Sequence, residues 1–227
     1  MKQKIFIIGF ITGVMMMLGC DNNQDDNTTE KDSTKVQSIK PKNILFTTPT
    51  VEETLPEFED KIDTTNLQFN QDDWRQIEFI SKPQKNSIVL EIEKIKDVYD
   101  HFSQKTDSYT AFKKVALRDI IKEPLAVDFS KLKSYLSVNN AQIKGVSLYN
   151  NSGQVRNGFS FTVNGITYYG VLNNNTVQTF CIHSIDGKEN LKTSIENLSK
   201  FLKGESLYLI DWVRMKVIDE NNIGTEL

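Results

Sequence analysis

The segment from Gly158 to Val171 reads Gly-Phe-Ser-Phe-Thr-Val-Asn-Gly-Ile-Thr-Tyr-Tyr-Gly-Val. Two alternating runs flank Asn164-Gly165, the dipeptide that most readily adopts a type I′ turn. Such a turn fixes the register of a β-hairpin, and one face then carries three predicted pairs: Val163 with Ile166, Phe161 with Tyr168, and Phe159 with Gly170. Ser160, Thr162, Thr167 and Tyr169 occupy the other face, so Tyr169 is predicted to point away from the core.

The alternating pattern extends on both sides of this hairpin. From Gln142 onward it predicts strands near 143–149, 156–163, 166–172 and 176–183, followed by a helix near 188–203 and a last strand over 206–218. No proline follows Pro124. This suits a central sheet, whose backbone ladder needs every N–H group.

Helical patterns precede the strands. Apolar residues recur at helical spacing after Ser87 and end at Phe102. A shorter helix is expected from Asp128 to Leu136, whereas Gln76 to Ile80 can begin a strand or continue a helix. We therefore expect one α+β domain over 62–227. Its sheet would be mainly antiparallel, a meander near 142–183 plus a C-terminal strand, with helices packed on one face.

The first twenty residues have the character of an export signal. Lys2 and Lys4 precede an apolar run from Ile5 to Leu18. This run is shorter than the roughly 20 residues that a membrane-spanning helix needs, and its length suits the h-region of a secretory signal. An ordinary signal peptide and an uncleaved membrane anchor are the two alternatives to the lipoprotein signal described next.

The end of this segment, Met17-Leu18-Gly19-Cys20, resembles the lipobox of bacterial lipoproteins, although Met17 stands where leucine is commonest. The resemblance implies a signal peptide over 1–19, cleavage before Cys20, and a lipid on the Cys20 sulfur. Acyl chains contribute roughly 0.8 kcal/mol per buried methylene, so two or three of them would hold the protein to a membrane. Asp21 matches an inner-membrane retention signal, whereas Gln24-Asp25-Asp26 matches a surface-export signal. The membrane and leaflet therefore stay open.

The residues that follow Cys20 are polar. The segment 21–60 has ten acidic residues and four lysines, and 61–227 has a net charge of only +1. Such a composition predicts that 20–61 is a disordered tether, with Ile44-Leu45-Phe46 as an alternative docking segment or short edge strand. The near-neutral remainder excludes the concentrated basic face of nucleic-acid-binding proteins.

Candidates for catalysis are few. Cys181 and His183 would share one strand face, but two ligands do not make a metal site and no third group is marked. Asp211 interrupts an apolar run, and a β-bulge, an edge position or a hydrogen bond to backbone or arginine explains it better than a role as a catalytic acid does. No nucleotide, hydrolase or metalloprotease motif is present. We expect no enzyme activity, metal or cofactor.

Aromatic residues supply the remaining signal. Tyr169 and Trp212 are the candidate partner contacts, because tyrosine and tryptophan are enriched at binding hot spots. The sequence therefore predicts a lipoprotein of the bacterial envelope that binds a protein partner, as an immunity or inhibitor protein or as a subunit of an envelope assembly. The alternative is an enzyme or a small-ligand carrier acting on envelope components.

Overall fold

The computed structural model describes residues 45–61, 63–119, 123–138, 141–149, 151, 153–186 and 191–227. The predicted signal peptide and Cys20 lie outside these residues. None of the helices in the described part has both the length and the apolar character that crossing a membrane requires.

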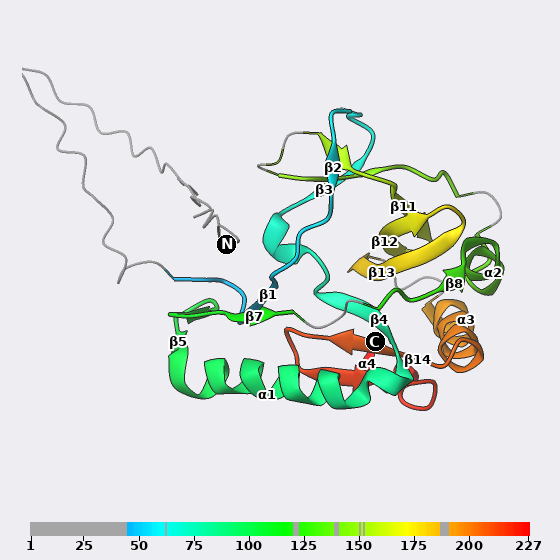
Figure 1. Ribbon diagram of the computed structural model, residues 1–227. Coiled ribbons are helices and arrows are strands. Elements are labelled where there is room, and N and C mark those ends of the chain that lie inside the picture. Colours follow the sequence, from blue (N-terminus) through cyan, green and yellow to red (C-terminus); the bar gives the residue numbers. More distant parts are fainter. Residues whose placement is uncertain are drawn as a thin grey trace, which may run out of the picture. The chain divides into compact units, whose positions relative to one another are not determined.

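A seven-stranded sheet lies at the centre of the folded part (Figure 1). Its strands follow one another in space in the order β11 (Gly158–Val163), β12 (Ile166–Asn173), β13 (Thr176–Ile185), β4 (Ile77–Ser81), β14 (Leu207–Asp211) and β15 (Lys216–Ile218), and β8 (Val127–Asp128) also pairs with β13. Every pairing in this sheet is antiparallel. The α+β class is confirmed.

The hairpin of β11 and β12 has the predicted register. Val163 pairs with Ile166, and Phe159 pairs with Gly170. Asn164 and Gly165 both have positive φ angles, 50° and 77°, as a type I′ turn requires. The dipeptide thus sets the pairing of the whole hairpin.

In the described part of the chain, four helices accompany the sheet: α1 (Lys85–Phe102), α2 (Phe129–Tyr135), α3 (Leu191–Gly204) and α4 (Ile223–Glu226). Two short 3-10 turns, η2 (Gln71–Asp73) and η3 (Lys82–Gln84), flank β4. The predicted helix 128–136 is present, and Asp128 caps it by accepting hydrogen bonds from the N–H groups of Ser130 and Lys131.

The helices lie on both faces of the sheet, not on one as expected. Phe79 and Leu209 belong to the core that includes α3, whereas their neighbours Ile80 and Ile210 belong to the core that includes α1. The physical reason is that β4 and β14 are central strands with apolar side chains on both faces, and each face must be covered.

A second layer covers β12 and β13 on the side away from α3. Strand β3 (Leu67–Phe69) pairs in parallel with β9 (Val146–Leu148), separately from the main sheet. The predicted strand near 143–149 therefore exists as β9, which lies outside the main sheet, although Lys144 just before it forms an isolated bridge with Ser160 of β11. Phe69 and Trp74 pack with residues of β12 and β13 in this layer.

The N-terminal segment belongs to the folded domain. Strand β1 (Thr50–Glu52) pairs in parallel with β7 (Ala116–Arg118), and β2 (Phe58–Glu59) pairs with β10 (Gln154–Val155). Phe46 forms a bridge with Phe112 of the β5 (Ser103–Lys105) and β6 (Thr110–Phe112) hairpin. The predicted boundary at residue 62 is thus wrong for 45–61, because distant segments supply the partners that this polar stretch lacks locally. At Phe46 the structure has an isolated bridge and not a strand, and Ile44 of the alternative edge strand lies outside the described residues.

Candidate functional site

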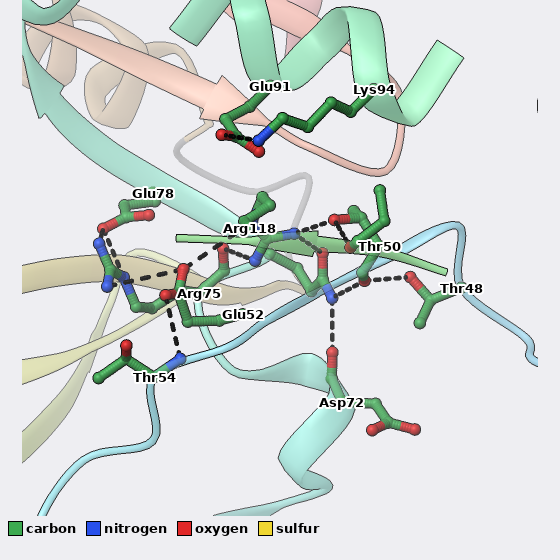
Figure 2. Close-up of polar contacts among 12 residues, drawn as sticks. Thr48, Thr50, Glu52, Thr54, Asp72, Arg75, Glu78, Glu91, Lys94 and Arg118 are labelled. Carbon is green, nitrogen blue, oxygen red and sulfur yellow. Dashed lines mark hydrogen bonds and ion pairs between the residues drawn. The ribbon is translucent and has the colours of Figure 1, made fainter. Parts of the chain in front are cut away.

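Four charged side chains gather in the interior where β1, β4 and β7 meet (Figure 2). Glu52 comes from β1, Glu78 from β4 and Arg118 from β7, and Arg75 precedes β4. Their residues are between 0% and 8% exposed. Burial of a charge is unfavourable unless it is paired and hydrogen-bonded, so the partners of these four groups decide what the cluster can do. We call these four residues the ion cluster.

The charges of the ion cluster balance. Arg75 donates through Nε to Oε1 of Glu78 at 2.7 Å, and its second terminal nitrogen lies 2.5 Å from the same oxygen. Oε2 of Glu52 lies 3.7 Å from Nη1 of Arg75 and 4.0 Å from Nε of Arg118. Two guanidinium groups therefore face two carboxylates, and no net charge is left.

Arg118 also connects its strand to two other chain segments by three hydrogen bonds. It donates to Thr50 Oγ1 at 3.0 Å, to Gln76 Oε1 at 3.1 Å and to the carbonyl of Arg75 at 3.0 Å. Its guanidinium lies 5.2 Å from the centre of the Trp212 ring, within reach of a cation–π contact. Arg118 thereby ties β1 to the segment that precedes β4.

The environment shifts the pKa values in the ion cluster. Burial raises the pKa of Glu52, although Arg75 opposes the rise. Burial also opposes the charge of Arg75, but Glu78 and Glu52 together raise its pKa. Burial lowers the pKa of Arg118 to about 10, and the two carboxylates offset only part of this effect. At neutral pH both arginines stay charged.

The ion cluster is incompletely hydrogen-bonded. Oε2 of Glu52, Oε2 of Glu78 and Nε of Arg118 have no hydrogen-bond partner among the described residues.

Arg75 also has a positive φ of 58°, held in part by a 2.7 Å hydrogen bond from its N–H to the hydroxyl of Tyr169. A left-handed backbone at a non-glycine residue is unfavourable. The surrounding structure therefore imposes this conformation.

Arg75 borders two small hollows on the surface, of about 140 and 360 Å³, which also share Gln178 and Thr179. Its charge is already neutralised by Glu78 and Glu52, so these hollows offer no excess positive charge to an anion. The ion cluster is best explained as a structural feature that holds the segment 45–61 against the rest of the domain.

Tyr169 and Trp212 do not lie at the surface as the partner-contact prediction required. Both residues are 0% exposed. The layer formed by Phe69 and Trp74 covers Tyr169, whose ring centre lies 4.8 Å from that of Phe69. Trp212 packs in the α1 core and under Arg118. Neither can contact a partner in the folded domain.

The three weaker candidates do not form one site. Burial raises the pKa of the Cys181 thiol well above its usual value, which keeps it protonated and a poor nucleophile. His183 is half-buried, with its ring centre 4.8 Å from that of Phe69. Asp211 accepts a 2.9 Å hydrogen bond from the Arg214 N–H and ends β14, which is the backbone hydrogen bond weighed as its alternative. Within the described residues, no group of three or more metal-ligating side chains occurs.

The ion cluster was missed by sequence reasoning, although a signal for it exists. Glu78 interrupts the apolar run Ile77-Glu78-Phe79-Ile80, and Arg118 follows Val115-Ala116-Leu117. Charged residues are almost never fully buried unless they are paired. Two opposite charges inside apolar runs therefore indicate a buried pair. The sequence alone does not show that the two residues lie close together in space.

A larger hollow of about 820 Å³ runs beside α1, and we call it the α1 groove. One wall is α1, from Ser87 to Phe102, and the other is the segment 114–116 with Asp119. Leu90 projects into it and is 59% exposed. Glu91 also lines the groove and pairs with Lys94 at 2.6 Å (Figure 2).

Comparisons with known proteins add no assignment. No protein-family model matches the chain, and neither the curated proteins nor the solved structures contain a match.

Proposed function

We propose that this chain is a lipoprotein of the bacterial envelope, anchored through Cys20, whose folded domain binds a protein partner. The observation that carries the binding role is the α1 groove, where Leu90 is 59% exposed beside charged side chains. An apolar anchor with a polar rim is the usual composition of a protein-binding surface. Immunity or inhibition, and membership of an envelope assembly, are the roles that fit such a tethered module.

The placement of the groove supports this proposal. Phe46, near the first described residue, packs with the core that lies beneath α1 and includes Ala116 of the groove wall. The first described residues, which follow the predicted tether in sequence, therefore lie on the α1 side of the domain.

Site-specific photo-crosslinking in cells tests the binding role. A photoreactive amino acid at position 90 should give a discrete crosslinked protein, because Leu90 lines the groove and is accessible. The matched control is position 143, where Ile143 is 45% exposed and lies outside the groove. Equal products from both positions, or none from position 90, would remove the support for a groove-bound partner.

A further inference from the structure

Strand β1 is held to the domain by chain segments that lie far from it in sequence. The hydroxyl of Thr50 donates to the carbonyl of Ala116 at 2.9 Å and accepts from Arg118 at 3.0 Å. The carbonyl of Thr50 accepts from Gln76 at 2.8 Å, and Glu52 faces the two guanidinium groups of the ion cluster. These contacts form a slot for an extended segment that has a hydroxyl at one position and a carboxylate two positions later.

The slot has a net positive charge when β1 is taken away. Arg75 and Arg118 then face Glu78 alone, because Glu52 supplies the fourth charge of the ion cluster. A buried charge that loses its partner is strongly destabilising. A folded molecule therefore needs a filled slot, and two segments match it equally well: its own β1 and the identical β1 of a second copy.

The linker between β1 and β2 is placed to act as a hinge. Residues 53–57 form neither a helix nor a strand (Figure 1). Thr54 to Glu57 border the hollow of about 360 Å³, so the linker has open space on one side. The β1–β7 pair is also separate from the main sheet. Exchange of β1 would thus leave the central sheet intact, and exchange of an identical element between copies is a low-cost route to a dimer.

An apolar side chain beside the slot is exposed in the single chain. Leu117 of β7 is 52% exposed and is the register partner of Val51 in β1. Its neighbours Ala116 and Arg118 are buried on the opposite side of β7, as the alternation of a strand requires. Two copies that exchange β1 must approach each other at this pair of strands, where the second copy can cover Leu117.

We propose that two copies of this chain exchange β1 reciprocally, so that Thr50 and Glu52 of each copy fill the slot of the other, with residues 53–57 as the hinge. This inference rests on the proposed function as a subunit of an envelope assembly, and it names a second copy as a partner. Anchoring of both copies to one membrane favours the exchange, because it raises their effective concentration.

Disulfide crosslinking between single-cysteine variants tests the exchange. Full-length Val51→Cys and Leu117→Cys, with tags of different size, are produced in the same cells and oxidised. A disulfide that joins the two tagged chains should form in greater yield than one between Val51→Cys and Ile143→Cys, whose position is 45% exposed and lies outside both strands. Wild type gives the background from its native cysteines. Equal yields from the two combinations overturn the exchange.

The double variant Val51→Cys/Leu117→Cys shows whether the two positions can be bridged. A disulfide within one chain of this variant, together with no disulfide between the singly substituted chains, means that β1 stays in its own slot and overturns the exchange.

Hinge length supplies an independent measurement. Deletion of Leu55 and Pro56 shortens the linker, so β1 reaches its own slot less easily, and the dimer fraction measured by light scattering in detergent should rise. Insertion of four glycines after Leu55 should lower both the dimer fraction and the yield of the 51–117 disulfide between chains. Near-ultraviolet circular dichroism shows whether the deletion variant folds, and if it does not, the insertion variant decides. An insertion variant with the dimer fraction and disulfide yield of wild type overturns the proposal.

The exchange and the binding role of the α1 groove can fail separately. A 51–117 disulfide between chains, without any protein crosslinked from position 90, would retain the exchange and reject the groove as a partner site. A distinct protein crosslinked from position 90, with disulfide yields equal to the control, would retain the binding role and reject the exchange.

Discussion

At the residue scale, Arg118 is the group whose removal should harm the fold most. It is fully buried, and it hydrogen-bonds to Thr50, Gln76 and the carbonyl of Arg75. Arg118→Met would leave Glu52 and Glu78 with one counter-charge. Breaking a buried ion pair costs about 3–5 kcal/mol, so we expect a loss of that size in the free energy of unfolding, measured with urea.

The matched control for Arg118 is Arg156→Met. Arg156 pairs with Glu57 at 2.8 Å, but both side chains are more than half exposed. Exposed pairs contribute about 0–1 kcal/mol. Equal losses for the two variants would contradict the role assigned to the ion cluster.

Glu52 should give stability an unusual dependence on pH. Burial raises its pKa above the usual 4.5, so the folded state binds this proton more tightly than the unfolded chain does. The stability of wild type relative to Glu52→Gln should therefore fall as pH rises from about 4.5 through the folded-state pKa. Urea unfolding of both proteins across this range measures the difference.

Asp128 should give the opposite dependence of stability on pH. Hydrogen bonds from the N–H groups of Lys131 and Ser130 lower its pKa below 3.8. The stability that Asp128 adds relative to Asp128→Asn is present above 3.8 and should be lost as pH falls through the folded-state pKa. If Glu52 and Asp128 gave slopes of the same sign, the burial of Glu52 would not be the dominant effect.

Individual residues show where sequence reasoning stops. The register of Val163 with Ile166 was predictable, because a local dipeptide fixes it. The burial of Tyr169 was not, because Phe69 and Trp74, about a hundred positions earlier, cover it. Alternation assigns a side chain to a face of a sheet, but it does not tell whether a second layer covers that face.

At the element scale, close packing between β11, β12 and β13 depends on Gly170. A Cβ at this position would lie 2.1 Å from the carbonyl oxygen of Thr179 and 2.9 Å from the Phe159 ring. Gly170→Ala should therefore destabilise the domain by about 1–3 kcal/mol, the usual effect of overpacking. Thermal or urea unfolding measures the loss.

Gly224→Ala is the control for this substitution. Its nearest new contact would be Ile195 at 3.8 Å, an ordinary van der Waals distance, and the site lies in α4. Alanine favours a helix more than glycine does, so this variant should be neutral or slightly stabilising. A neutral Gly170→Ala would show that the neighbouring strands separate easily.

Elements with strong local signals were predictable, and those with weak ones were not. Helix α1 follows its apolar spacing, whereas the predicted last strand over 206–218 is two strands, β14 and β15. Asp211 and Arg214 form the turn between them, and Met215 has a φ of 56°. Aspartate is a common turn residue, but the segment 212–215 contains no glycine, proline or asparagine, so the apolar run concealed the hairpin.

At the scale of the whole molecule, residues 45–61 should be needed for folding. They supply β1 and Glu52, one of the two carboxylates of the ion cluster. A chain that starts at residue 62 would leave Arg75 and Arg118 opposed by Glu78 alone. We expect it to lose cooperative unfolding and near-ultraviolet circular dichroism, whereas a chain that starts at residue 39 should retain both. A folded chain from residue 62 would restore the boundary inferred from composition.

The anchor is tested by Cys20→Ala in the full chain. Lipidation of Cys20 predicts that wild type incorporates radiolabelled palmitate and sediments with membranes, because two or three acyl chains bury enough methylenes for stable attachment. The variant should lose the label and become soluble or stay unprocessed, while the folded domain keeps the urea unfolding midpoint of wild type. Surface protease on intact cells then separates a surface location from a periplasmic one. A variant that fractionates and labels as wild type would reject the lipoprotein proposal, yet it would leave the α1 groove to be judged by the crosslinking experiment.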